Sequence, residues 1–168
     1  MIAGLRDVSL HKILHSDIEM LRNWRNDKKI ASNMFYQEHI TPQMQEKWFN
    51  SLNNNDFYFI IKTKDKAIGL INLAQIDTKK QEGQVGLFIY NEEFWGTPAP
   101  VFASLLLLQF AFEEKKLNCV WAKVRTENKQ AINYNKMLGF EMVKENMQQL
   151  TFSNYKNIVK PLLQKIVQ

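Results

Sequence analysis

The turn Gly96-Thr97-Pro98-Ala99-Pro100 is the stretch of this chain whose residue types best suit the binding of an anion. It precedes a long apolar segment, and unpaired N–H groups at the start of a helix, together with the helix dipole, favour a negative charge. Proline fits a first helical turn but donates no hydrogen bond, so Pro98 and Pro100 remove up to two of these groups. The N–H donors that remain are those of Gly96, Thr97, Ala99, Val101 and Phe102.

Other residues with reactive side chains are few and scattered. Cys119 is the single cysteine and lies within a predicted strand, with no histidine near it in the sequence, so we expect it to pack rather than to act as a nucleophile. His11, His15 and His39 have no partners at metal-ligand spacing. The sequence therefore predicts neither a cysteine nucleophile nor a metal site.

Residues 84–140 alternate between strand and helix and would hold the turn in place. Residues 85–90 are β-branched and aromatic, as in a buried strand, and residues 99–116 predict a helix that is apolar almost all round before its charged end. Residues 118–125 predict a second strand, and Asn128 is a good N-cap for a helix that Gly139 would end. Two strands joined by a crossover helix should be parallel, with a right-handed connection.

The first half of the chain predicts antiparallel strands with helices between them. Residues 5–10 alternate as a strand does, and helices are expected to start near residues 16–17 and at Thr41-Pro42. Residues 57–62 and 67–76 predict two strands joined by a turn.

Composition indicates one domain over residues 1–168, with 45% hydrophobic residues and a formal net charge of +5. The lysines are scattered, so nucleic-acid binding is not indicated, and the mild positive balance would suit an anionic ligand. No segment resembles a signal peptide or a membrane span, and we expect a cytoplasmic protein with no membrane association, with a homodimer as a candidate assembly.

The sequence NKQAINYNKMLGF, preceded by VGLFIYN and a long helix, resembles the second half of the GNAT superfamily of acetyltransferases. The resemblance implies an α/β (mixed α+β) GNAT fold, with a central twisted sheet of about seven strands, splayed parallel strands 4 and 5, and flanking helices. It implies acetyl-CoA as co-substrate, with the pantetheine along the first parallel strand and the pyrophosphate at the turn. The cofactor-binding residues that it implies are Leu87, Phe88, Ile89, Gly96, Thr97, Ala99, Val101, Phe102, Asn128, Ile132 and Asn135.

The segments LRNWRNDKKIASNMF and ITPQMQEKWFNSL are similar to the acceptor-binding half of one branch of this superfamily. That branch contains the ribosomal-protein N-acetyltransferases and the nucleotide-sugar N-acetyltransferases of bacterial glycan pathways, and the pseudaminic acid enzymes among the latter are the most similar. The resemblance implies that Trp24, Arg25, Asn26 and Met34 face the acceptor, although Trp24 and Met34 also suit a core and Arg25 a surface ion pair. A buried arginine could bind a diphosphate bidentately.

Two catalytic positions depart from the family pattern. The superfamily often has a tyrosine as proton donor where this chain has Asn135, and Tyr134 lies one residue earlier, about 100° away around a helix. Tyr134 is therefore either the proton donor or a packed helix residue. Related sugar enzymes tend to have Glu where this chain has Lys123, so Glu82 and His39 are the candidate bases.

Three functions compete on this basis. The first is transfer of an acetyl group to the amine of a nucleotide-linked amino-dideoxy sugar by direct attack on the thioester. The second keeps the cofactor but uses a peptide or protein N-terminus as acceptor. The third is a non-catalytic GNAT-fold binding module, which Pro98, Pro100, Lys123 and Asn135 favour.

Overall fold

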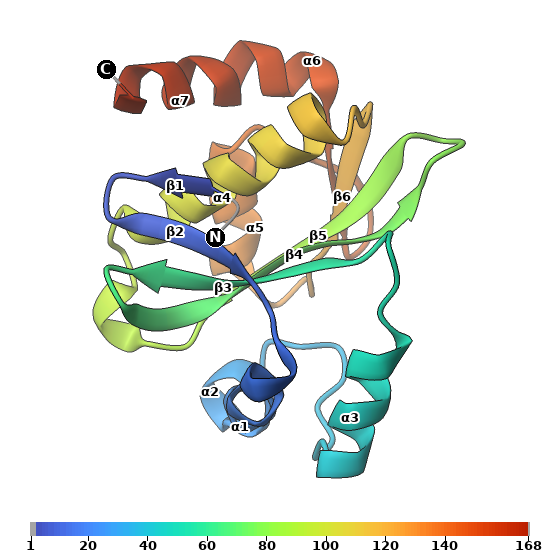
Figure 1. Ribbon diagram of the computed structural model, residues 1–168. Coiled ribbons are helices and arrows are strands. Elements are labelled where there is room, and N and C mark those ends of the chain that lie inside the picture. Colours follow the sequence, from blue (N-terminus) through green and yellow to red (C-terminus); the bar gives the residue numbers. More distant parts are fainter. Residues whose placement is uncertain (1–2, 168) are drawn as a thin grey trace.

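An eight-stranded mixed sheet forms the centre of the computed structural model, which describes residues 3–167 (Figure 1). The strand order is β1-β2-β3-β4-β5-β6-β8-β7, and every neighbouring pair is antiparallel except β5 and β6. This arrangement confirms the expected mixed α/β fold with one parallel pair. The strands are β1 (Ala3–Leu5), β2 (Val8–Lys12), β3 (Phe57–Thr63), β4 (Lys66–Asp77), β5 (Glu82–Ile89), β6 (Cys119–Lys123), β7 (Glu141–Lys144) and β8 (Met147–Thr151).

The expected first strand, residues 5–10, is a hairpin rather than one strand. β1 and β2 pair antiparallel with Leu5 opposite Val8, and Arg6 in the turn between them has φ 55°. Leu5 and Val8 are three residues apart, so the turn residues Arg6 and Asp7 interrupt the alternation that a single strand over residues 5–10 would require. The sheet therefore has eight strands where about seven were expected.

Helices cover both faces of the sheet (Figure 1). One face carries the N-terminal helices α1 (Ile18–Asn26), α2 (Lys28–Ala31) and α3 (Pro42–Ser51), and the other carries α4 (Ala99–Gln109), α5 (Lys129–Met137), α6 (Phe152–Asn154) and α7 (Lys160–Val167). Short 3-10 turns, η1 (His15–Asp17) and η2 (Glu92–Phe94), precede α1 and follow β5. In the described part of the chain, no helix has the length and apolar character needed to cross a membrane.

The buried residues form two clusters, one on each side of the sheet. The larger contains α4, which is buried almost all round, together with parts of α5 and α7. The smaller lies under α1 and includes Leu21, Trp24, Ile60 and Leu70. The two clusters hold the two sets of helices on one rigid sheet.

The helix predicted over residues 99–116 is regular only as far as Gln109. It continues as a π-helical turn, η3 (Phe110–Glu114), whose side chains meet the second π-helical turn, η4 (Tyr155–Val159). Phe112 stacks on Tyr155 with ring centroids 4.7 Å apart, and the Tyr155 hydroxyl donates to Glu113 at 2.8 Å. These contacts fix the end of α4 against the C-terminal helices.

The parallel strands β5 and β6 separate after a short paired segment. They pair only from Glu82 opposite Cys119 to Gln84 opposite Trp121, whereas β5 remains paired with β4 as far as Ile89. The last residues of β5 therefore border a gap in the sheet. This confirms the splay that the family resemblance implied.

The helix that closes the gap, α5, begins and ends as the sequence predicted. Asn128 is its N-cap, and its side-chain oxygen accepts the Ala131 N–H at 3.1 Å. Gly139 follows the helix with φ +90°, and a Cβ there would approach Ile158 to 2.9 Å. The backbone conformation favours glycine at this position, and a Cβ would also displace the end of the Ile158 side chain.

Candidate functional site

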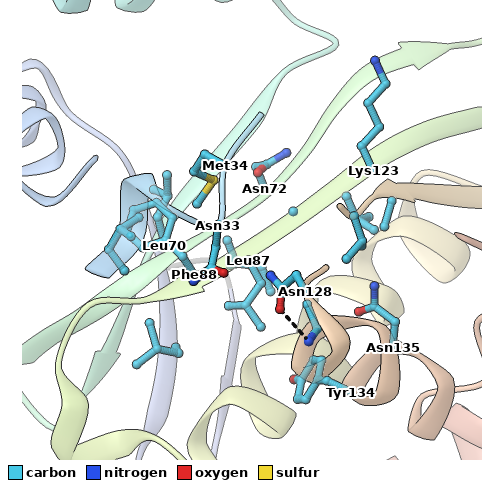
Figure 2. Close-up of a pocket in the computed structure, with 18 of the residues that line it drawn as sticks. Asn33, Met34, Leu70, Asn72, Leu87, Phe88, Lys123, Asn128, Tyr134 and Asn135 are labelled. Atoms are coloured by element: carbon cyan, nitrogen blue, oxygen red, sulfur yellow. Dashed lines mark hydrogen bonds between the residues drawn. The ribbon is translucent and has the colours of Figure 1, made fainter. Parts of the chain in front are cut away.

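A cleft of about 1240 Å³ lies where β5 and β6 separate. One side is formed by α1, the segment after α2 and strand β4, and the other by the start of α4 and by α5. In Figure 2, Asn33, Met34 and Asn72 lie on the first side, Asn128, Tyr134 and Asn135 lie on the second, and Leu87 of β5 lies between them. The cleft thus joins the two halves of the chain that the sequence suggested for acceptor and cofactor.

The backbone of β5 directs N–H donors into this cleft. The Tyr90 N–H bonds to the Ile68 carbonyl on β4. By alternation the backbone N–H groups of Phe88 and Gly86 also point toward β4, whereas those of Leu87 and Ile89 point toward the gap. The Ile89 carbonyl already accepts the indole N–H of Trp95 at 3.0 Å. Because β5 pairs with β6 only as far as Gln84, the Leu87 N–H has no backbone partner among the described residues and is free to bind a ligand. The three predicted strand residues, Leu87, Phe88 and Ile89, all line the cleft.

The start of α4 offers fewer free N–H groups than the sequence indicated. The Thr97 N–H bonds to Phe94, the Phe102 N–H bonds to Pro98, and the Ala99 N–H makes a long 3.4 Å contact with the Thr97 hydroxyl. Within residues 3–167 this leaves the N–H groups of Gly96 and Val101 unpaired. Gly96, Thr97 and Val101 line the cleft, whereas Ala99 and Phe102 do not.

On α5, Tyr134 and Asn135 both line the cleft, although they are adjacent in sequence. The Tyr134 hydroxyl lies 2.8 Å from the hydroxyl of Ser104 on α4, and burial raises the pKa of Tyr134 to about 12. The Asn135 amide donates one of its N–H groups to Gln148 at 2.9 Å. Asn128 lines the cleft near its cap, and Ile132 packs in the core behind the wall.

On the acceptor side, Arg25 and Met34 line the cleft. The Nε atom of Arg25 is buried and has no hydrogen-bond partner in the described part of the chain. Burial lowers the pKa of Arg25, and the neighbouring Tyr58 partly opposes this shift. A guanidinium held in this way favours an anionic partner, because an uncompensated buried charge is costly.

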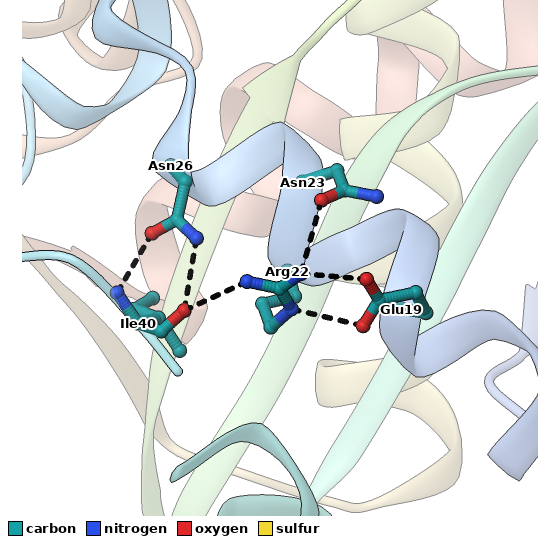
Figure 3. A network of polar contacts seen from close by, with 5 residues as sticks. All are labelled: Glu19, Arg22, Asn23, Asn26 and Ile40. Carbon is teal, nitrogen blue, oxygen red and sulfur yellow. Dashed lines mark hydrogen bonds and ion pairs between the residues drawn. The ribbon is translucent and has the colours of Figure 1, made fainter. Parts of the chain in front are cut away.

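Trp24 and Asn26, the other two predicted acceptor residues, support the cleft from behind. Trp24 stacks on Tyr90 with ring centroids 5.1 Å apart, in the smaller core cluster. Figure 3 shows that Asn26 pairs with the backbone of Ile40, accepting its N–H at 2.8 Å and donating to its carbonyl at 2.9 Å. Arg22 donates to the same carbonyl at 3.1 Å, so α1 anchors the segment that carries Met34.

The two candidate bases lie outside the cleft. Glu82 is at the paired end of β5, 3.8 Å from the Lys80 ammonium, and His39 is exposed in the segment before α3. Among the described residues that line the cleft there is no histidine, and Glu145 is the one carboxylate. The structure therefore brings no strong base to the gap beside Leu87.

Several lining residues were not singled out from the sequence. Asn72 on β4, Gln84 on β5 and Ser104 on α4 all contribute polar groups. Strand alternation places Asn72 and Gln84 on the acceptor face, which the sequence could have indicated only if the strand register had been known. Ser104 lies within an apolar helix and gave no signal of its own.

The charges that line the cleft are mainly positive. Its cations are Arg25, Lys29, Lys123 and Lys144, and only Lys29 has a carboxylate partner among residues 3–167, Glu92 at 3.1 Å. This balance favours an anionic ligand over a polycationic one.

A family model described as acetyltransferase (GNAT) domain matches residues 7–141. Among solved structures, apo FdhC, a nucleotide-linked sugar GNAT, has a TM-score of 0.83 at 19% identity and covers 100% of this chain and 99% of that chain. Spermidine N-acetyltransferase from Vibrio cholerae, in complex with CoA and spermine, has a TM-score of 0.79 at 18% identity, with coverages of 90% and 99%. A domain from Methanocaldococcus jannaschii has a TM-score of 0.78 at 20% identity, with coverages of 86% and 98%. No curated protein matches the sequence.

Proposed function

The chain belongs to the GNAT acetyltransferase domain family, whose members use acetyl-CoA, and we propose that it acetylates the amine of a nucleotide-linked amino-dideoxy sugar. The observation that carries the proposal is that three cations lining the cleft, Arg25, Lys123 and Lys144, have no carboxylate partner among the described residues. A diphosphate-linked sugar would satisfy these charges. The structural likeness to a nucleotide-linked sugar GNAT supports the same choice.

Acetyl-CoA fits the gap between β5 and β6. In this arrangement the Leu87 N–H would polarise the thioester carbonyl, and the N–H groups of Gly96 and Val101 would bind the pyrophosphate. Two donors at the turn are fewer than a turn without proline would offer. We therefore expect binding that depends strongly on the pantetheine contacts along β5.

The reaction needs a neutral amine, a polarised carbonyl and a proton for the departing thiolate. The amine nitrogen forms a bond to the thioester carbon, the carbon–sulfur bond breaks, and the amine proton passes to solvent. Tyr134 is the proposed donor of a proton to the thiolate, because it lines the cleft and a phenol is protonated at neutral pH. Asn135 cannot replace it, since an amide supplies no proton in this range.

Other acceptors fit the cleft less well. A polyamine would place positive charge next to Arg25 and Lys123, with Glu145 as the one carboxylate among the described lining residues. A peptide N-terminus lacks the phosphates that would satisfy these cations. A non-catalytic module remains the alternative that Pro98, Pro100, Lys123 and Asn135 favour.

Substitution of Arg25 tests the acceptor directly. With a nucleotide-linked amino sugar, Arg25→Ala should raise the acceptor KM by about 10- to 100-fold, because a charge-assisted hydrogen bond contributes about 1.5–3 kcal/mol. The acetyl-CoA KM should be unchanged. Lys29→Ala is the matched control, since its charge is already paired with Glu92 and its loss should have a smaller effect. Equal changes in both KM values, or none, would contradict the proposed diphosphate contact.

A further inference from the structure

Asn72 and Gly86 face each other across β4 and β5, on the acceptor side of the sheet. A Cβ on Gly86 would lie 2.7 Å from Oδ1 of Asn72, which is closer than two such atoms can approach. Gly86 does not have a positive φ, so backbone conformation does not require glycine here. The missing side chain instead leaves room for the Asn72 carboxamide over the backbone of β5.

The Asn72 carboxamide is free to bind a ligand. It makes no hydrogen bond within residues 3–167, and its polar atoms are not among the buried unpaired ones, so they face the cleft rather than the core. Figure 2 shows Asn72 on the same side of the cleft as Met34. The Asn72 carboxamide lies over Gly86, in a notch left by the missing side chain of that glycine, and has no hydrogen-bond partner among the described residues. It is therefore a suitable partner for a polar group of the substrate.

This notch lies next to the proposed reaction centre. Gly86 immediately precedes Leu87, whose N–H faces the gap, and consecutive Cα atoms are about 3.8 Å apart. A thioester carbonyl bound to Leu87 would therefore be adjacent to the Asn72 carboxamide. An attacking amine must keep its lone pair directed at the thioester carbon, and an acceptor for one of its N–H groups fixes that orientation.

We propose that Asn72 orients the acceptor amine by accepting one of its N–H groups through Oδ1, and that Gly86 is required to admit the carboxamide. This role rests on the proposed N-acetyl transfer. An amide does not take up a proton, so the amine proton still leaves to solvent and the amine must be neutral before it attacks. Asn72 thus takes the place beside the thioester where a general base would otherwise be expected.

Kinetics of Asn72 variants with acetyl-CoA and a nucleotide-linked amino sugar test the role. Asn72→Ala should lower kcat by about 10- to 100-fold, as expected for a misoriented nucleophile, and should leave the Kd of acetyl-CoA unchanged. Asn72→Asp should move the rising limb of the pH–rate profile to lower pH, because a carboxylate can also accept the amine proton. Asn157→Ala removes an exposed asparagine outside the cleft; it is the control and should stay within about twofold of wild type.

A double-mutant cycle tests whether Gly86 acts through Asn72. Gly86→Ala should lower kcat, and Gly86→Ala combined with Asn72→Ala should be no slower than Asn72→Ala alone. Unchanged acetyl-CoA affinity shows that each variant is folded. If the wild type is active and Asn72→Ala leaves its kcat unchanged, or if the two substitutions have additive effects, the proposed role of Asn72 is wrong. The proposed N-acetyl transfer is not affected by either result. A wild-type chain that binds acetyl-CoA but acetylates no amine overturns the proposed function itself, and this role with it.

Discussion

Replacement of Pro100 by alanine should strengthen acetyl-CoA binding. Pro100 is the second residue of α4 and lines the cleft, beside the unpaired N–H of Val101. Alanine restores a donor at this position without adding the flexibility of glycine. Three N–H groups, at positions 96, 100 and 101, would then face the pyrophosphate instead of two.

The size of the effect follows from one added hydrogen bond to a charged group. Such bonds contribute about 1.5–3 kcal/mol, and we take the lower value because the turn is open to solvent. About 1.4 kcal/mol corresponds to a tenfold change in Kd, so Pro100→Ala should bind acetyl-CoA about tenfold more tightly. Loss of the buried proline ring should lower the stability of the unliganded protein slightly, because apolar contacts are removed.

Titration calorimetry with two ligands separates the pyrophosphate contact from the rest. The gain should appear with acetyl-CoA and disappear with acetyl-pantetheine, which lacks the pyrophosphate. Pro98→Ala is the matched control, because Pro98 does not line the cleft and its replacement should change the Kd less than about twofold. If Pro100→Ala binds acetyl-CoA no more tightly than wild type, the missing amide does not limit binding at this turn.

Three further predictions concern side chains around the cleft. Tyr134→Phe should lower kcat by about 10²-fold with little change in the acetyl-CoA KM, because it removes the proposed proton donor and keeps the ring; unchanged turnover would return Tyr134 to a packing role. The pKa of Tyr134 is about 12 in the folded chain and about 10 in the unfolded chain, so the unfolded chain loses this proton first and stability falls as pH rises from 10 to 12. Chemical denaturation should show that the wild type loses about 3 kcal/mol of unfolding free energy more than Tyr134→Phe over this range. Equal losses in the two proteins would contradict the raised pKa. Asn26→Ala should lower the free energy of unfolding by about 1–3 kcal/mol and raise the acceptor KM, because two hydrogen bonds to Ile40 are lost; an unchanged acceptor KM would show that this anchor does not shape the cleft.

The sequence predicted the second half of the fold better than the first. Asn128 and Gly139 have local roles, as an N-cap and as a positive-φ residue, and such roles can be recognised from neighbouring residues alone. The turn at Arg6 breaks the apolar alternation between Leu5 and Val8, but residues 5–10 are too few for this break to distinguish a hairpin from one irregular strand. The π-helical turn after Gln109 depends on contacts with residues about 40 positions later, which a local pattern does not contain.

The cleft shows the same division between local and tertiary information. Leu87 and Gly96 belong to a continuous motif, and both line the cleft as expected. The hydrogen bond from the Thr97 N–H to the Phe94 carbonyl could not be predicted, because it depends on the conformation of the turn that follows η2. Tyr134 lies about 100° around its helix from the position where the family has its tyrosine, so its direction could not be predicted from the sequence. In the structure its hydroxyl meets that of Ser104 on α4.

The acceptor is tested most directly by acetyl-CoA consumption against three panels, which are nucleotide-linked amino sugars, polyamines and N-terminal peptides, each measured at several pH values. Because the described residues of the cleft leave Arg25, Lys123 and Lys144 without carboxylate partners, turnover should be confined to the nucleotide sugars. It should rise with pH as the amine loses its proton and should fall as salt is added, since screening weakens charge pairing. Turnover of spermidine or of peptides with none of the nucleotide sugars would contradict this account.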